Sequence, residues 1–292
     1  MPVCDAERYV AEAVRSILNQ TLRDLELVII DDGSTDRTAE IVRELAASDE
    51  RLRLHTGRIR GLIAALNEGC ALATAPLLAR MDADDIAEPT RLARQVEAMD
   101  AKSELVLIGT AVTQIDERGV AFATVSYPAV PDTELLERNC FAHPTVVFRR
   151  DAFEQTGGYR DLFRHAEDYD LWLRLAELGR VANLPEPLLR YRVHKAQVTR
   201  TRIQEQAAAT LAAQTSARAR RAGGVEPESV ELAIDESMLS QRVLEAHLDL
   251  AAVAIRASQY DEAERLLDSA DSVSVDGHLA MRRRVPMLRA RL

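Results

Sequence analysis

The amino-acid sequence predicts an α/β fold in which a mainly parallel sheet is flanked by helices and followed by a helical C-terminal region. In the first half of the chain, short β-branched apolar runs alternate with amphipathic helical patterns. Such alternation is typical of crossover units, which build parallel sheets. From about residue 199 the pattern stays helical to the end. We therefore expect one domain over residues 1–200 and a helical region over residues 201–292.

The individual elements follow from the spacing of apolar residues. Val10, Val14 and Ile17 recur at the spacing of an amphipathic helix, whereas the continuous apolar run at residues 25–30 is typical of a strand buried on both faces. In chain order, we predict a helix at 6–19, a strand at 25–30, a helix ending near 47, a strand at 52–55, a helix at 62–73, a strand at 77–81, a helix at 89–101, extended chain at 105–115, a strand at 145–148, a helix at 168–178, and extended chain at 181–184 and 188–193.

Composition and charge restrict the partners. The net charge of -10 argues against nucleic acid, because phosphate binding needs clustered Lys and Arg. Two small basic clusters, at residues 218–221 and 282–284, fit either a solvated helix face or a contact with anionic lipid headgroups. Three widely spaced cysteines form no disulfide or zinc pattern. We expect a cytoplasmic protein, with peripheral attachment at the inner face of the membrane as the alternative, because neither a membrane span nor a signal peptide is recognised.

An acidic run follows the predicted strand at residues 77–81. Asp82, Asp84 and Asp85 place three carboxylates at one strand end, which is electrostatically unfavourable unless a cation is bound there. In extended chain Asp82 and Asp84 point to the same side, so one can bind a hard cation while the other reaches a ribose or a metal-bound water. The alternative is a surface loop whose Asp residues cap the next helix.

A second acidic pair, Asp31 and Asp32, ends the strand at residues 25–30. Ligands of parallel sheets bind at the carboxyl ends of the strands, so both acidic sites can face one crevice. Asp32 can accept a hydrogen bond from a nucleotide base or a ribose, or the pair can form a turn before a capped helix. A phosphoacceptor receiver domain also carries such a pair, but it needs a lone Asp at a later strand end, where this chain has a cluster.

Two later residues complete the candidate set. Asp168 begins a predicted helix, where it acts either as a cap or as a general base within reach of an acceptor hydroxyl. His194 follows an extended stretch, and His is a common ligand of divalent metals. A lone His is more often an ordinary surface or core residue, so both interpretations stay open.

Taken in order, these segments resemble the family 2 glycosyltransferases with the GT-A fold. The resemblance covers residues 1 to about 200 and leaves out the helical C-terminus. Each motif is weak alone, and their order and spacing make the match specific. The matching segments are residues 2–7, 16–21, 26–36, 61–69, 79–85, 91–95, 157–159, 167–172 and 191–194.

The resemblance implies transfer of a sugar from a nucleotide-diphosphate donor, usually a UDP-sugar, with inversion, to a glycan, lipid-linked or other hydroxyl acceptor in cell-surface polysaccharide synthesis. It implies that Asp32 contacts the base or ribose, and that Cys4 and Arg60 also lie at the nucleotide-sugar. Asp82 would touch the ribose or the metal shell. It implies further that Mg²⁺ or Mn²⁺ is held by Asp84 and His194, and that Asp168 deprotonates the acceptor.

The chain departs from the family pattern near its first residue. Members place a full apolar strand before the Pro2-Val3 segment, and Asp5 stands where Asn is usual. We therefore expect a shortened first strand, and either a true start upstream of Met1 or a truncated product. This departure motivates an alternative function, a degenerate nucleotide-sugar-binding protein without turnover. A further hypothesis makes residues 200–292 a helical module that docks the enzyme to a partner or membrane.

Overall fold

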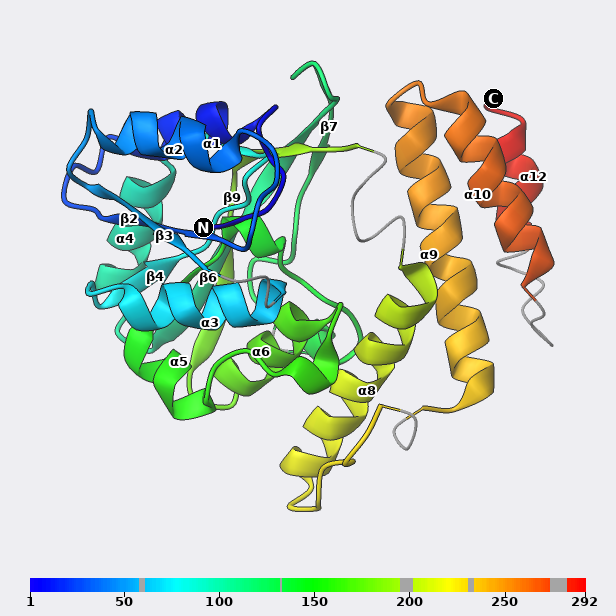
Figure 1. The fold of residues 1–292 in the computed structure, drawn as a ribbon. Helices are drawn as coiled ribbons and strands as arrows, with labels where there is room; N and C mark the ends of the chain where they lie inside the picture. The colour runs from blue at the N-terminus through cyan, green and yellow to red at the C-terminus, as the bar shows by residue number, and fades with distance from the viewer. Residues whose placement is uncertain (58–60, 132, 195–201, 231–233, 274–282) are drawn as a thin grey trace.

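The N-terminal part of the molecule contains two β-sheets (Figure 1). The computed structural model describes residues 1–57, 61–131, 133–194, 202–230, 234–273 and 283–292. The first sheet has the order β1-β2-β3 and is parallel throughout. Its strands are β1 (Pro2–Val3), β2 (Leu27–Asp31) and β3 (Leu52–Thr56).

The second sheet is mixed and has the order β4-β8-β6-β9-β5, with β7 paired to β6. Its central strands β6 and β9 are parallel, whereas the other pairings are antiparallel. Parallel pairing is thus concentrated in the first sheet and at the centre of the second. The strands are β4 (Leu77–Ala79), β5 (Ile86–Ala87), β6 (Leu105–Ile115), β7 (Ala121–Val125), β8 (Val147–Arg149) and β9 (Arg180–Arg192).

Helices cover the sheets and continue into the C-terminal region (Figure 1). The N-terminal helices are α1 (Val10–Leu18), α2 (Thr38–Ala46), α3 (Leu62–Leu72), α4 (Arg91–Ala101), α5 (Arg150–Thr156) and α6 (Glu167–Leu175). Short 3-10 helices are η1 (Glu134–Leu136), η2 (His143–Thr145) and η3 (Asp161–Phe163). The C-terminal helices are α8 (Ile203–Arg221), α9 (Glu236–Arg256), α10 (Tyr260–Ser272) and α12 (Arg284–Arg289).

Most predicted elements are present, although their ends differ by up to four residues and α5, β5 and β7 were not predicted. Two further differences concern β9 and β8. The extended segments at 181–184 and 188–193 form one strand, β9, because the prolines between them are absorbed by register shifts in the β6–β9 pairing. Thr145, predicted to begin a strand, instead ends η2, and β8 begins at Val147. β1 has two residues and pairs with the end of β2.

Helix α8 shares a hydrophobic core with the sheet region. Its alanines Ala209, Ala213 and Ala217 belong to the same buried cluster as Trp172 and Leu173 of α6. Small side chains let two helices approach closely, so α8 lies directly against the helix that carries Asp168. Helices α9, α10 and α12 bury a separate cluster of their own.

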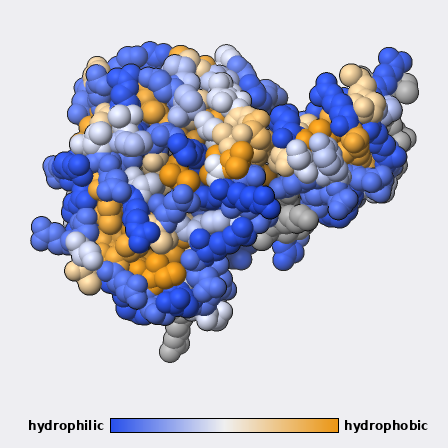
Figure 2. All heavy atoms as spheres, turned by 90° about the horizontal axis from the view of Figure 1, so that it is seen from above, coloured by the Kyte–Doolittle hydropathy of each residue, from blue (hydrophilic) through white to orange (hydrophobic). Residues whose placement is uncertain are grey.

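These three C-terminal helices form an arm that extends from the rest of the molecule in the space-filling view (Figure 2). Hydrophilic residues cover most of that face, with apolar residues in separate patches. Among the described helices, none is long and apolar enough to cross a membrane. The predicted division of the chain at residue 200 stays a prediction, although α8 packs with the sheet region.

Candidate active site

A pocket of about 620 Å³ opens where strands β1 and β2 end. It gathers five of the residues singled out from the sequence, although they lie up to 190 positions apart: Cys4, Asp32, Asp82, Asp84 and His194. Further lining residues are Pro2, Val3, Asp5, Ala6, Arg8, Tyr9, Leu62, Ala65, Ala83 and Glu117. The ends of β1 and β2 of the first sheet thus meet the segments that follow β4 and β9 of the second sheet at one crevice.

The two carboxylates that end β2 point in different directions. Asp31 is buried, and its Oδ1 accepts hydrogen bonds from the backbone and hydroxyl of Ser34, at 3.1 and 2.5 Å. Asp32 faces the pocket, and its Oδ2 accepts from the backbone N–H of Gly61 at 2.8 Å. Gly61 has a φ of 89°, which favours glycine at this start of α3. Asp31 therefore shapes the turn and leaves Asp32 at the pocket.

Asp5, which stands where the family usually has Asn, organises the same loop. Its φ is 45°, a left-handed conformation that Asp and Asn tolerate better than other side chains. Its Oδ1 accepts from the backbone N–H groups of Thr35 and Asp36, at 2.7 and 3.4 Å. An Asp can accept these bonds as well as an Asn, so the departure leaves the loop intact.

The acidic run after β4 brings three carboxylates together. Side-chain oxygens of Asp82, Asp84 and Asp85 lie within 4.8 Å of one another. Asp84 and Asp82 line the pocket, and Asp84 Oδ2 lies 2.7 Å from Nε2 of His194. Asp85 points inward, where its Oδ1 accepts from the backbone N–H of Arg192 at 2.7 Å. Within the part of the chain that the structure describes, Asp85 Oδ2 is buried without a hydrogen-bond partner.

Arg80 is the buried cation beside this run. It is only 7% exposed, and its guanidinium forms an ion pair with Asp82. Burial raises the pKa of Asp82, as does the neighbouring Asp84, whereas Arg80 opposes the rise. Burial also raises the pKa of Asp85 well above its usual value, with Asp84 and Asp82 adding to the effect. The ion pair with Arg80 thus leaves the repulsion among the three carboxylates only partly compensated, and a divalent cation would reduce it further.

Tyr9 holds His194 at the rim of the pocket. The two rings stack with centroids 6.1 Å apart and an interplanar angle of 27°. The guanidinium of Arg192 covers the Tyr9 ring at 4.5 Å, a cation–π arrangement. Arg192 also donates to the backbone oxygen of Asp84 at 2.7 Å. This stack thus connects β9 with the acidic run and orients the imidazole toward Asp84.

Asp168 lies in the first turn of α6, apart from the residues that line this pocket. Its Oδ2 accepts a hydrogen bond from Nδ2 of Asn139 at 3.0 Å, and its Oδ1 accepts from the backbone N–H of Tyr169 at 2.7 Å. Burial raises the pKa of Asp168 to about 7, and the adjacent Glu167 contributes. Arg80 lowers the pKa of both Asp168 and Asp82, so its positive charge acts on both sites.

One predicted site residue, Arg60, lies outside the described residues, so the structure gives no view of it. Other residues of the site were missed by the sequence reasoning, namely Arg80, Tyr9 and Asn139. Arg80 and Tyr9 adjoin recognised motifs, but nothing in their spacing marks them as buried neighbours of carboxylates. Asn139 carries no sequence signal, because its meeting with Asp168 depends on the packing of distant segments.

The region that carries these residues matches a known family. Glycosyl transferase family 2 matches residues 1–157, more than half of the chain. The O-antigen biosynthesis glycosyltransferase WbnJ of Escherichia coli is 38% identical over 200 residues, which cover 66% of this chain and 78% of that protein. The putative glycosyltransferase EpsE of Bacillus subtilis is 36% identical over 198 residues, which cover 66% of this chain and 71% of that protein.

Solved structures share the fold over nearly the whole chain. The mannosyltransferase PcManGT from Pyrobaculum calidifontis, in complex with GDP-Man and Mn²⁺, has a TM-score of 0.61 at 22% identity, covering 99% of this chain and 78% of that one. S. aureus TarS 1-349 in complex with UDP-GlcNAc has a TM-score of 0.57 at 16% identity, covering 92% and 89%. The predicted GT-A fold is confirmed, and the chain belongs to glycosyl transferase family 2.

Proposed function

We propose that this glycosyltransferase moves a sugar from a nucleotide-diphosphate donor, with a UDP-sugar preferred, to a hydroxyl group, and that it inverts the anomeric carbon. One observation carries the proposal: the pocket of about 620 Å³ gathers Asp32, Asp82, Asp84 and His194 from distant parts of the sequence. Hydrogen-bond acceptors on one side and hard-cation ligands on the other are what the two ends of a nucleotide diphosphate need.

In this proposal the nucleoside lies against the ends of β1 and β2. The carboxylate of Asp32 accepts from the base or the ribose, and Cys4, whose Sγ lies 3.9 Å from the backbone oxygen of Asp32, lines the same wall. Asp82 contacts the ribose, and its ion pair with Arg80 fixes the position of its carboxylate. The assignment of Arg60 to nucleotide-sugar binding follows from the family resemblance alone.

Asp84 and His194 are the proposed ligands of Mg²⁺ or Mn²⁺. The donor set fits such an ion, because a carboxylate oxygen and an imidazole nitrogen lie 2.7 Å apart beside two further carboxylates. Both Asp82 and Asp85 have pKa values raised by burial and by repulsion from Asp84, which a divalent cation would relieve. When bound, the ion would neutralise the charge that grows on the diphosphate leaving group.

Asp168 is the proposed base. A carboxyl with a pKa near 7 is ionised often enough at neutral pH to accept a proton, and basic enough to take one from a hydroxyl. The N–H bonds from Asn139 and the Tyr169 backbone fix the plane of the carboxylate. A single displacement by the deprotonated acceptor inverts the anomeric carbon and needs no covalent intermediate.

The names of the relatives indicate the kind of acceptor. Similar proteins are named for O-antigen biosynthesis in Escherichia coli and for amylovoran biosynthesis in Erwinia amylovora, the latter 35% identical over 195 residues. We propose a role in the synthesis of a surface polysaccharide, with a glycan or lipid-linked acceptor at the inner face of the membrane. The structural neighbours bind different donors, GDP-Man and UDP-GlcNAc, so the donor has to be determined directly.

Nucleotide release tests the proposal. The purified chain is incubated with Mn²⁺ or Mg²⁺ and a panel of UDP-sugars and GDP-mannose, with EDTA as the control. We expect release of the nucleotide from one donor class, loss of release with EDTA, and an inverted anomer in the product by NMR. Binding of UDP with Mn²⁺ but no release from any donor would instead support the alternative, a nucleotide-sugar-binding protein without turnover.

A further inference from the structure

The buried face of α8 carries one polar side chain that reaches toward Asp168. Gln214 is 1% exposed in a helix face that is otherwise formed largely by alanines. Its Nε2 donates to the backbone oxygen of Glu137 at 2.8 Å and to the hydroxyl oxygen of Tyr169 at 3.2 Å. A buried amide is costly unless it is hydrogen-bonded, so this side chain has a specific geometry to satisfy.

The two segments that Gln214 joins are the same two that meet at Asp168. Tyr169 follows Asp168 in α6, and Glu137 lies two residues before Asn139, whose amide binds the Asp168 carboxylate at 3.0 Å. The Tyr169 hydroxyl also donates to the backbone oxygen of Leu135 at 2.6 Å. Gln214 therefore closes a hydrogen-bonded ring between the segment that leads to Asn139 and the residue that follows Asp168.

Helix α9 supports this ring from the outside. The guanidinium of Arg242 donates to the backbone oxygen of Glu137 at 3.1 Å and to Oε1 of Gln214 at 3.4 Å. Arg242 is only partly exposed, with 29% of its side chain accessible. Two successive C-terminal helices thus hold the 135–139 segment against α6.

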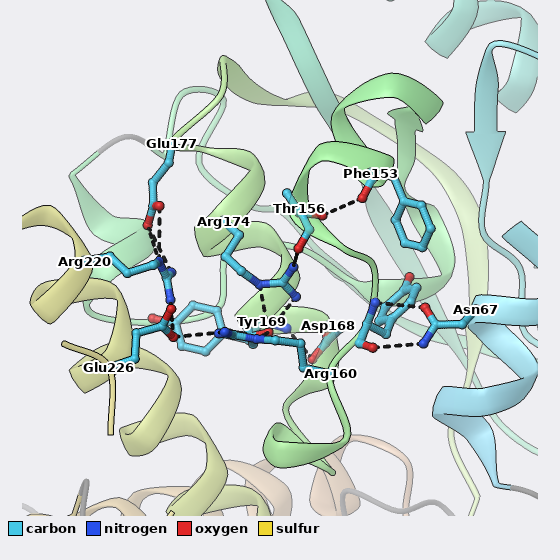
Figure 3. A network of polar contacts seen from close by, with 12 residues as sticks. Asn67, Phe153, Thr156, Arg160, Asp168, Tyr169, Arg174, Glu177, Arg220 and Glu226 are labelled. Carbon is cyan, nitrogen blue, oxygen red and sulfur yellow. Dashed lines mark hydrogen bonds and ion pairs between the residues drawn. The ribbon is translucent and has the colours of Figure 1, made fainter. Parts of the chain in front are cut away.

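A charged network holds α6 on another side (Figure 3). Asp170 is fully buried and receives hydrogen bonds from Arg160 and Arg174, each through Nε at 3.0 Å. Arg160 continues to Glu226 at 3.0 Å, and Glu226 in turn binds Arg220 of α8 at 2.9 Å. The segment after α8 is therefore tied to the same turn of α6 that carries Asp168.

We propose that Gln214 is a positioning residue for Asp168, and that α8 and α9 act as a clamp on the acceptor side of the active site. The inference rests on the proposed role of Asp168 as base. It concerns a part of the chain that lies beyond the family match at residues 1–157. The clamp sets the distance between the Asp168 carboxylate and the acceptor, where a displacement of about 1 Å can cost roughly 100-fold in rate.

Gln214→Met tests the clamp in the full chain. Methionine keeps the volume and removes the amide, while Glu137 keeps its bond from Arg242 and Tyr169 keeps its bond to Leu135, so the variant should fold. We expect kcat to fall about 10- to 100-fold, with the donor KM unchanged within about twofold. Arg242→Met should act in the same direction and more weakly. Gln241→Met is the control, because that amide bonds Glu245 on its own helix.

Hydrogen exchange gives a second readout that needs no activity. We expect faster exchange over residues 135–141 in Gln214→Met, including the Phe141 amide that donates to Asn139, and unchanged exchange in α1. Unchanged exchange in that segment overturns the clamp, and so does faster exchange with an unchanged kcat. If Asp168→Asn leaves nucleotide release intact, the proposed base fails separately, and exchange alone then decides whether α8 holds the Asp168–Asn139 pair.

Discussion

The donor pocket and the surroundings of Asp168 are built in different ways. The pocket residues lie just after strands, since Asp32 follows β2 and Asp82 follows β4, and the two sheets bring these strand ends together. Asp168 is held instead by Asn139 from a loop and by the backbone of α6, and Gln214 of α8 binds the backbone of the same loop. The first arrangement can be read from short motifs, whereas the second exists only once distant segments have packed. The following predictions test whether the two regions also respond differently to substitution.

The largest effect is expected from Asp168→Asn. An amide cannot accept the proton of the acceptor, and a general base typically contributes about 10²- to 10⁴-fold. We therefore expect kcat for nucleotide release to fall by that factor, measured with the best donor of the panel and Mn²⁺. Binding of UDP with Mn²⁺, measured by calorimetry, should stay unchanged because the pocket lining does not include this residue. A loss of UDP affinity would show that the two regions are not separable.

Asp170→Asn should affect stability rather than donor binding. Asp170 is fully buried between two guanidiniums, so its neutralisation leaves Arg174, which is 7% exposed, without its charged partner. Breaking a buried pair in this way costs about 3–5 kcal/mol, which we expect as the loss in the free energy of unfolding.

Urea titration measures that loss, with Asp161→Asn as the matched control. Asp161 also pairs with an arginine, Arg164, but both side chains are more than half exposed. An exposed pair contributes about 0–1 kcal/mol. Equal losses in the two variants would show that the Asp170 network does not anchor α6.

The sequence and the family resemblance together predicted which residues share the pocket, whereas they did not predict the surroundings of Asp168. Cys4, Asp32, Asp82, Asp84 and His194 were all assigned to the nucleotide or the metal, and the structure brings them to one pocket. Alternation of apolar residues places the strand ends, but β2 and β4 belong to different sheets, so the meeting of Asp32 and Asp82 also depends on how the two sheets pack.

The environment of Asp168 could not be derived in the same way. Its raised pKa comes from burial, which depends on how loops and helices pack over α6. Asn139 and Gln214 lie 29 residues before it and 46 after it, with no pattern to connect them. Arg80 was quoted within a motif, yet its burial beside Asp82 follows from tertiary packing alone.

Asp84→Asn should weaken the metal site while leaving the Asp168 region intact. The amide keeps the shape of the carboxylate but removes the charge that a divalent cation requires. Loss of even an outer-shell partner lowers metal affinity about 10- to 100-fold, so loss of a direct ligand should lower Mn²⁺ affinity at least tenfold.

Isothermal titration with Mn²⁺ in the presence of UDP measures this change. Asp261→Asn, an exposed acid on α10, is the control for the loss of one negative charge. Exchange over residues 135–141 should be the same in both variants. Unaltered Mn²⁺ affinity in Asp84→Asn would remove this residue from the proposed ligand set.

The pH dependence gives the smallest effect and the most direct view of the base. The carboxyl must be ionised to accept a proton, and burial raises the pKa of Asp168 to about 7. Below that pH, kcat/KM should fall about tenfold per unit, and above it a plateau should follow. Stability depends on pH in the opposite direction from kcat/KM. Because the folded state binds the proton more tightly, the contribution of Asp168 is present at acid pH and is lost as pH rises through about 7.

Asp168→Asn should therefore stabilise the chain at pH 8 relative to the wild type, and to a smaller extent at pH 5, while it lowers turnover at both. Thermal unfolding at the two pH values measures the difference. Asp32→Asn, at the donor pocket, is the comparison, since no buried charge is removed there. If the unfolding temperatures of both variants change equally with pH, burial does not set the pKa of Asp168. A larger change in unfolding temperature with pH for Asp168→Asn than for Asp32→Asn would show that the packing of α6 sets the pKa of the proposed base.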